Sequence, residues 1–161
     1  MRNRDPVVSN TTPLITLSGV GLLDLLPALY QAIQIPEAVY TEYQQGRLHV
    51  PGSPDLAELP WLSVHETAPD PMIPVTLDAG EAEAIALARA IQARLILLDE
   101  RRGRAVAARL GLPVAGSLAV LLQAKRRGLI PLVAPVLDQM IAQGRRISPQ
   151  LRTQVLASAG E

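Results

Sequence analysis

A short apolar run that ends in two acidic residues constrains the fold of this chain more than any other feature. The run is Leu95 to Leu98, and Asp99 and Glu100 follow it directly. Helical patterns at residues 80–92 and 102–110 flank it, which predicts an inner strand of a parallel sheet covered on both faces. In such sheets the ligand site lies beyond the carboxyl ends of the strands. The pattern therefore places Asp99 where chemistry is expected.

The length and composition of the chain predict one globular domain. A chain of 161 residues is long enough for one domain with a substantial core and short for two, so we predict a single domain over residues 1–161. The apolar fraction of 48% favours a packed globule over a disordered chain. Because the chain has no Phe, one Trp and three Tyr, we expect Leu, Ile, Val and Ala to fill the core.

Several classes of protein are excluded by what the sequence lacks. There is no Cys, which excludes a disulfide scaffold, a thiolate metal site and a thiol nucleophile. Two His, His49 and His65, are too few for a multi-histidine zinc site. Pro, Gly or charged residues interrupt every apolar stretch before it reaches the length of a bilayer span, and the polar N-terminus has no secretory apolar region. We therefore expect a soluble cytoplasmic protein without a membrane partner.

The formal net charge of zero conceals an uneven distribution. Residues 1–80 contain three basic and nine acidic residues, whereas residues 81–161 contain twelve basic and six acidic ones. The basic second half allows a local anion-binding face, and solvated helix surface is the competing interpretation.

Strand and helix patterns alternate along the chain. We predict strands at residues 6–9, 33–35, 61–64, 95–98 and 113–115. We predict helices from about residue 13, at 22–29 and 36–43, and then at 80–92, 102–110, 117–127, 133–143 and 149–157. Thr11 or Thr12 is expected to cap the first helix, with Pro13 at its first position. Proline-rich loops occupy residues 46–60 and 69–74, with a short helix expected near residues 55–59. The alternation predicts a mainly parallel sheet with right-handed crossovers.

Four oxygen-bearing side chains are candidates for one site. Asn10 follows the first strand and Asp99 follows a later one, so both are expected at the carboxyl edge of the sheet. Glu42 lies on the helix after Pro36, and Glu81 lies in the first turn of the next long helix. Mg²⁺ and Mn²⁺ prefer such oxygen ligands. A metal held there would activate water for in-line hydrolysis of a phosphodiester.

Each position also has a structural interpretation. Glu81 and Glu83 suit the positive end of a helix dipole, an effect worth roughly 0.3–1 kcal/mol. Glu42 suits an exposed helix face, Asp99 suits a cap on the following helix, and Asn10 suits an Asx turn.

Basic residues lie close to the candidate site. Arg101, Arg102 and Arg104 follow Asp99 at a helix start and are the RNA-contact candidates, because arginine binds backbone phosphates in a bidentate manner. The basic segment 125–127 precedes Gly128 and is better explained by the dipole at a helix C-terminus.

Four motifs, in order, resemble those of the PIN-domain superfamily. They are Val7 to Ile15, Ile35 to Glu42, Gly80 to Ala88, and Leu97 to Glu100 with Gly103 and Arg104. The closest similarity is to a PIN-like branch related to VapC-type toxin ribonucleases, and it extends over nearly the whole chain, including Gly116-Ser117.

The resemblance implies a three-layer α/β/α fold and a metal-dependent endoribonuclease, with Mg²⁺ or Mn²⁺ as cofactor and RNA as substrate. It places Asn10, Glu42, Glu81 and Asp99 at the four metal-binding positions, with Glu83 and Glu100 as neighbours that substitute in a shifted register. It also implies the toxin of a type II toxin–antitoxin pair with an antitoxin protein as partner. A homodimer is a further expectation, with the apolar helix at residues 22–29 as its candidate surface.

Asn10 is the one departure from the family pattern. Its amide oxygen can bind Mg²⁺ but brings no charge, so metal affinity and activity should fall. The alternative to a nuclease is therefore a catalytically weakened or inactive PIN-like module that binds nucleic acid or protein. A third hypothesis, a receiver-like phosphotransfer domain built on Asp99, is disfavoured because no acidic pair lies near the first strand.

Overall fold

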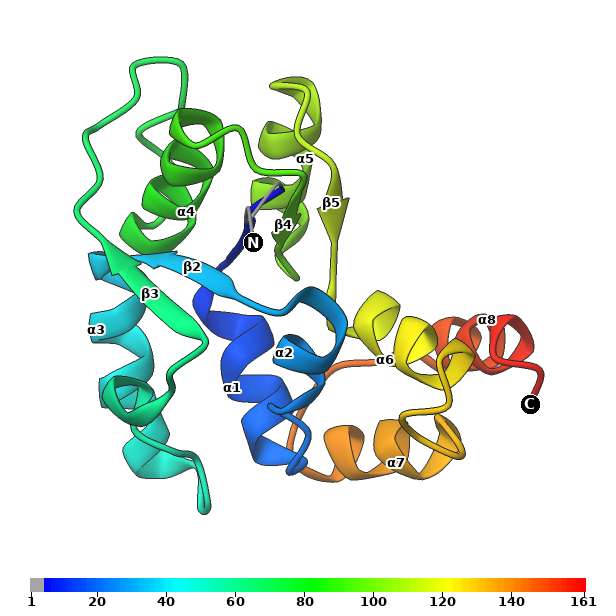
Figure 1. The fold of residues 1–161 in the computed structure, drawn as a ribbon. Helices are drawn as coiled ribbons and strands as arrows, with labels where there is room; N and C mark the ends of the chain where they lie inside the picture. The colour runs from blue at the N-terminus through cyan, green and yellow to red at the C-terminus, as the bar shows by residue number, and fades with distance from the viewer. Residues whose placement is uncertain (1–4) are drawn as a thin grey trace.

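The computed structural model describes residues 5–161, and its centre is a parallel sheet (Figure 1). Within these residues the sheet has five strands in the order β3-β2-β1-β4-β5, and every neighbouring pair is parallel. The strands are β1 (Val7–Ser9), β2 (Ile33–Pro36), β3 (Leu62–His65), β4 (Leu95–Leu97) and β5 (Val114–Ala115). The predicted parallel sheet is confirmed.

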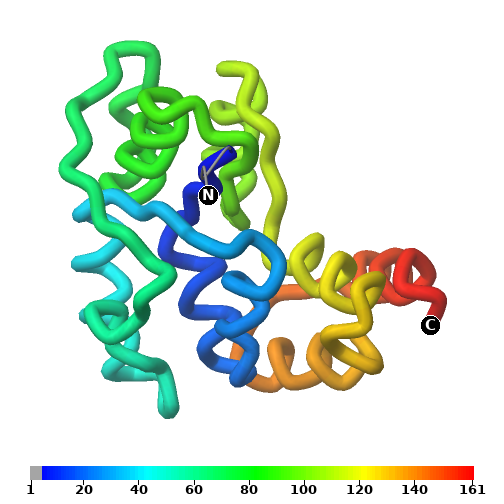
Figure 2. The backbone as a smooth tube through the Cα atoms, viewed as in Figure 1, coloured from blue at the N-terminus to red at the C-terminus, as the bar shows by residue number. Residues whose placement is uncertain are grey.

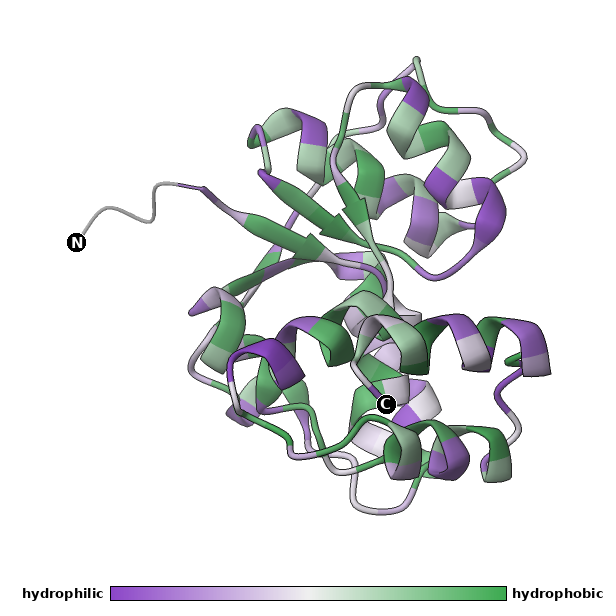
Figure 3. Cartoon of the chain, turned by 90° about the vertical axis from the view of Figure 1, so that its right-hand side faces the viewer, coloured by the Kyte–Doolittle hydropathy of each residue, from purple (hydrophilic) through white to green (hydrophobic). Residues whose placement is uncertain are grey.

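Helices cover both faces of this sheet (Figure 3). They are α1 (Thr11–Gly19), α2 (Leu25–Tyr30), α3 (Glu37–Gly46), α4 (Ala79–Ala90), α5 (Arg101–Arg109), α6 (Ser117–Arg126), α7 (Ala134–Ala142) and α8 (Pro149–Ser158). The short helices η1 (Arg47–His49) and η2 (Leu56–Glu58) interrupt the first proline-rich loop, the second of them at the expected place. Helix α4 packs against β1, β2 and β4, while α2 packs on β2 and α6 on β5. The chain thus forms the three-layer α/β/α fold that the resemblance implied.

The order of the strands creates a switch point between β1 and β4. The chain first builds the sheet on one side of β1 and then crosses to the other side, so the connections leave β1 and β4 in opposite directions. Val7, Val8 and Ser9 pair with Leu95, Ile96 and Leu97, and the backbone N–H of Asn10 donates to the Leu97 carbonyl at 2.9 Å. The two strands therefore end level with each other, at the crevice where open α/β sheets bind ligands.

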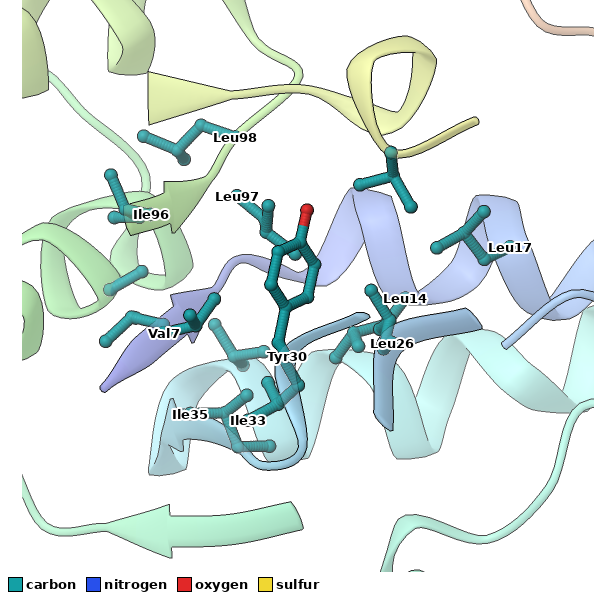
Figure 4. Close-up of a cluster of buried hydrophobic side chains, with 14 of the residues drawn as sticks. Val7, Leu14, Leu17, Leu26, Tyr30, Ile33, Ile35, Ile96, Leu97 and Leu98 are labelled. Atoms are coloured by element: carbon teal, nitrogen blue, oxygen red, sulfur yellow. The ribbon is translucent and has the colours of Figure 1, made fainter. Parts of the chain in front are cut away.

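The core is aliphatic, as the composition predicted. Figure 4 shows Val7 of β1, Ile33 and Ile35 of β2, and Leu97 of β4 near the apolar side chains of the first two helices. Ile96, which precedes Leu97, points to the opposite face of the sheet. Burial of these side chains on both faces explains why β1 and β4 read as continuous apolar runs. None of the described helices has the length and apolar character needed to cross a membrane.

The apolar helix predicted at residues 22–29 does not offer the expected dimer surface. The observed helix α2 begins at Leu25, and Leu25, Leu26 and Leu29 are buried in the core of the chain itself. Its apolar side is already covered because α2 packs on β2 and α6.

The predicted start of the first helix also needs correction. Helix α1 begins at Thr11 with Asn10 in the N-cap position, and no side chain caps it. Thr11 is the first residue of the helix rather than its N-cap, and its hydroxyl donates to Glu42. Pro13 consequently lies inside the first turn rather than at the first position.

The last two helices fold back toward the carboxyl edge of the sheet (Figure 2). The connection between α7 and α8 runs beside α1 and the start of α6, where Arg145 to Ile147 share a cleft with Thr12, Thr16 and Ser117. The C-terminal segment thereby lines the region into which β1 and β4 point.

Candidate functional site

Asn10 is buried at the end of β1 with one polar atom unsatisfied. Its side chain is 3% exposed, and its Oδ1 has no hydrogen-bond partner among the described residues. An amide oxygen buried without a partner costs free energy, about 1–3 kcal/mol in mutational data. The Asx-turn interpretation is not supported by any side-chain bond, and the orphan oxygen is available to a ligand.

Glu42 reaches this edge from α3, where a small residue and a hydroxyl make room for it. Thr11 Oγ1 donates to Glu42 Oε2 at 2.7 Å. A Cβ added to Gly80 would stand 2.5 Å and 2.6 Å from the two carboxylate oxygens, so a larger residue at the start of α4 would displace the Glu42 carboxylate. Glu42 is half-buried between α1 and α4, which argues against its interpretation as plain helix surface.

Glu81 occupies the first turn of α4 and is the most buried acidic residue of the described chain. It is 5% exposed, and Asp78 caps the helix by accepting the Glu81 backbone N–H at 2.8 Å. Burial raises the pKa of Glu81, and the negative charges of Asp78, Glu100 and Glu42 raise it further while Arg102 lowers it. Its carboxylate takes part in no hydrogen bond within residues 5–161. A cation would therefore supply the favourable partner that this buried carboxylate lacks.

Asp99 is held by the N-terminus of α6 rather than by its own helix. Its Oδ1 accepts the Ser117 backbone N–H at 2.7 Å, and its Oδ2 accepts the Ser117 hydroxyl at 2.6 Å. The N-cap of α5 is Glu100, without a side-chain bond, so the predicted capping role of Asp99 is wrong. Each oxygen keeps a free lone pair, because an ionised carboxylate offers about four acceptor sites.

The three arginines after Asp99 differ in their surroundings. Arg101 and Arg102 are exposed on the first turn of α5. Arg104 is half-buried and its Nη1 donates to the Leu98 carbonyl at 2.9 Å, which fixes the end of β4. Arg101 and Arg102 are therefore free for a phosphate, whereas Arg104 also serves the fold.

Three glycines form a common pattern around the acidic residues. A Cβ on Gly80 would strike Glu42, one on Gly103 would lie 3.4 Å from the Glu81 carboxyl carbon, and one on Gly116 would lie 2.8 Å from Asp99 Oδ1. Small residues opposite carboxylates allow helix starts to approach the site closely. The sequence carries this signal, since each glycine belongs to a quoted motif, but the pairing of each glycine with an acid appears only in three dimensions.

The carboxylates share one sheet edge without forming a closed cage. Among residues 5–161, no three His, Cys, Asp or Glu side chains lie close enough together to hold a metal ion. The expected convergence is thus only partial, because Glu42 and Asp99 take local partners and like charges repel. The donor set still fits a hard cation: it has an orphan amide oxygen and carboxylates only, and Mg²⁺ binds through one or two carboxylates while keeping several waters.

The fold and the edge together define the class of the protein, a doubly wound α/β/α chain with oxygen ligands at its switch point. The comparison with protein families then places it: the model of the family DUF3368, described as a PIN domain, matches residues 6–161. The chain therefore belongs to the PIN-domain family, a nuclease-type fold whose members generally depend on divalent metal ions. The comparison with curated proteins finds no match.

Glu81→Gln is expected to stabilise the metal-free protein at neutral pH. Because the pKa of Glu81 is raised in the folded state, that state binds its proton more tightly than the unfolded chain does, and stability falls as pH rises through the raised pKa. The neutral amide removes this loss. We expect Tm at pH 7 to rise by about 2–4 °C, which corresponds to about 1 kcal/mol at this chain length.

Thermal unfolding of wild type and Glu81→Gln between pH 4 and pH 8, in EDTA, checks this result. The gain should shrink toward pH 4, where wild-type Glu81 is protonated. Glu83→Gln on the same helix is the matched control, since its half-exposed carboxyl lies two positions beyond the buried one. An equal rise in Tm for both variants would contradict the burial of the Glu81 charge as the cause.

Proposed function

We propose that this protein is a metal-dependent endoribonuclease that hydrolyses RNA phosphodiesters at the switch point of its sheet. The observation that carries the proposal is the orphan Oδ1 of Asn10, buried at the end of β1 beside the strand that leads to Asp99. A buried oxygen without a donor is explained if a cation approaches it. Membership of the PIN-domain family supports both the chemistry and RNA as the substrate.

Asn10, Glu42, Glu81 and Asp99 are the residues that would hold the cation. A bound Mg²⁺ or Mn²⁺ supplies positive charge that polarises a phosphoryl oxygen and makes water more acidic. Thr11 and Ser117 orient two of the carboxylates through the hydrogen bonds described above. Such outer partners typically change metal affinity or activity by about 10–100-fold when they are removed.

Arg101 and Arg102 would hold the RNA backbone. Both side chains are exposed at the start of α5, directly after Asp99 and Glu100. Their guanidinium groups can bind a phosphate through two parallel hydrogen bonds, which orients the strand relative to the carboxylates. Arg104 contributes positive charge near Asp99. A Cβ on Gly116 would lie 2.8 Å from Asp99 Oδ1 and 2.9 Å from Arg104 Nη1, so the two side chains lie close to the same point.

The similarity to VapC-type toxins extends the proposal to a biological setting. We propose one domain over residues 1–161 that acts in the cytoplasm as the toxin of a type II pair, with an antitoxin protein as its partner. Growth arrest of cells that express the wild-type protein, and normal growth of cells that express Asp99→Asn, would be the direct test of the toxin role.

One observation favours a second function. Asn10 brings no charge to the position where a carboxylate would bring one, so a binding module that has kept the fold and lost the chemistry is the rival. The binding module expects binding of nucleic acid or protein, and only the nuclease expects metal-dependent cleavage.

Cleavage of a mixed RNA pool with Mn²⁺ or Mg²⁺, beside an EDTA control, tests the nuclease. Glu42→Gln is expected to reduce the cleavage rate at least about 10-fold, because the substitution removes the charge while keeping an acceptor for Thr11. Glu37→Gln is the matched control, because Glu37 is exposed at the start of the same helix and should retain wild-type cleavage.

Cleavage that persists in EDTA, or that Glu42→Gln leaves unchanged, would contradict the proposed site. RNA binding by wild type without cleavage in either metal would favour the binding module.

A further inference from the structure

A groove continues from the candidate site along α1. Its first part is a cleft of about 500 Å³ that Asp99, Glu100 and Ser117 line together with Thr16 and Arg145. Its second part is a cleft of about 320 Å³ lined by Thr16, Gly19, His49, Gln143 and Arg145. Because Thr16 and Arg145 line both clefts, the two clefts adjoin, and together they are called the groove.

A buried polar group at the junction has no partner. Thr16 is 4% exposed and lines both clefts, and its Oγ1 makes no hydrogen bond within the described residues. A hydroxyl is rarely buried unsatisfied without a reason such as an absent ligand. Because Thr16 lies in the second turn of α1, a cation held by the carboxylates does not explain why its hydroxyl lacks a partner.

The opposite wall carries two arginines on a fixed segment. Arg145 is half-buried and Arg146 exposed, and neither side chain forms a hydrogen bond or ion pair within residues 5–161. The segment is anchored from both sides: Gln143 Nε2 donates to the Gly19 carbonyl at 2.6 Å, and Arg145 N donates to the Met140 carbonyl at 3.0 Å. These bonds position the backbone of a segment whose Arg145 lines both clefts.

The charge of the groove changes along its length. The acidic residues Asp99 and Glu100 lie at one end, and Arg145 lies where the first cleft passes into the second. A polyanion can occupy such a path if its reactive phosphate lies at the acidic end with a cation and a neighbouring phosphate meets arginine. Arg145 comes from the connection between α7 and α8, visible in orange in Figure 1, far along the chain from Asp99.

We propose that this groove binds the RNA strand beyond the cleaved bond, with Arg145 and Arg146 holding backbone phosphates and the Thr16 hydroxyl bonding the strand. The inference rests on the proposed function and adds a substrate-binding surface to it. The C-terminal segment of the chain is therefore part of the nucleic-acid interface and not only a cover for the core.

The test measures binding separately from cleavage. A fluorescein-labelled single-stranded RNA is titrated with protein in EDTA, and anisotropy gives Kd at several salt concentrations. Arg145→Glu/Arg146→Glu is expected to raise Kd at least about 10-fold. It should also reduce the slope of log Kd against log salt by about 1.4, since each phosphate contact on a single strand contributes about 0.7.

Arg109→Glu/Arg126→Glu is the matched control. Both residues are exposed at helix C-terminal ends, neither lines the two clefts, and the change in net charge is the same. The control should remain within about twofold of the wild-type Kd.

Thr16→Val provides a second variant whose binding and stability should change in opposite directions. Valine has nearly the same shape and removes the orphan hydroxyl, so Tm is expected to rise by about 2–4 °C. The affinity for RNA is expected to fall about 3-fold to 10-fold. A purely structural role of Thr16 would leave RNA binding unchanged.

Equal binding by the groove variant and the control would overturn the groove, and wild-type cleavage in the same preparations would leave the proposed nuclease standing. Weaker binding of the groove variant without any cleavage by wild type would support the groove and overturn the nuclease. Wild type that binds RNA neither in EDTA nor with Mn²⁺ would overturn both.

Discussion

Asp99→Asn is expected to reduce metal-dependent RNA cleavage by about 100-fold or more, because it removes one negative charge from the end of β4 where a cation would be held. The substitution is isosteric, and its amide oxygen can still accept the Ser117 backbone N–H. The loss of activity therefore reports on charge and metal affinity rather than on unfolding. Initial cleavage rates across a series of Mn²⁺ concentrations measure it.

The stability of this variant provides an independent readout. Hydrogen bonds to a charged acceptor contribute about 1.5–3 kcal/mol and those to a neutral one about 0.5–1.5 kcal/mol, so metal-free Tm should fall by a few degrees. Asp138→Asn is the matched control, since Asp138 pairs with Arg152 on the surface and its substitution should leave cleavage unchanged. An Asp99→Asn protein that cleaves at the wild-type rate would remove Asp99 from the site.

Asn10→Asp is expected to act in the opposite direction, raising cleavage and metal affinity about 10-fold or more. The new carboxylate would bring the missing charge to the end of β1, next to the strand that leads to Asp99. Without metal the same change should lower Tm, because it buries another negative charge at a 3% exposed position on an already acidic edge. Saturating Mn²⁺ should reverse the loss through ligand linkage.

Thermal unfolding with and without Mn²⁺, together with cleavage rates, measures both effects. Gln34→Glu is the control, because Gln34 is another buried amide of the same sheet but lies within β2, where it pairs with His65. Metal should not restore the stability of that variant. If Asn10→Asp is less stable than wild type and Mn²⁺ does not restore its Tm, Asn10 does not face a cation. The missing charge at Asn10 would then no longer be a reason to favour the weakened binding module.

The sheet was predictable because its strands are short apolar runs bounded by clear helix and turn signals. The run at Leu95 to Leu98 and the helix that starts after Asp78 appear close to their predicted bounds. Helix starts were less predictable, as the first helix shows: it begins at Thr11, about two residues before the predicted start, and the Thr11 hydroxyl donates to a carboxylate of α3. Such a contact joins segments distant in sequence, and local preference cannot reveal it.

The surroundings of the candidate site were predictable only in part. That Asn10 and Asp99 share an edge follows from their positions directly after parallel strands. That Asp99 bonds Ser117, and that glycines make room for each carboxylate, depends on how the helices are placed over the sheet. The apolar residues of α2 illustrate the same limit, since their pattern cannot say whether the chain or a second copy covers them.

The sequence by itself determined the order of strands and helices, the aliphatic core and the identity of the acidic and amide side chains at the ends of strands. Local periodicity and residue chemistry are sufficient for these. The tertiary structure alone decided that Thr16 is left without a partner, that Glu81 is buried and that Arg145 and Asp99 line the same cleft. These features arise from segments distant in sequence that are brought together when the core is buried, and no local pattern encodes that proximity.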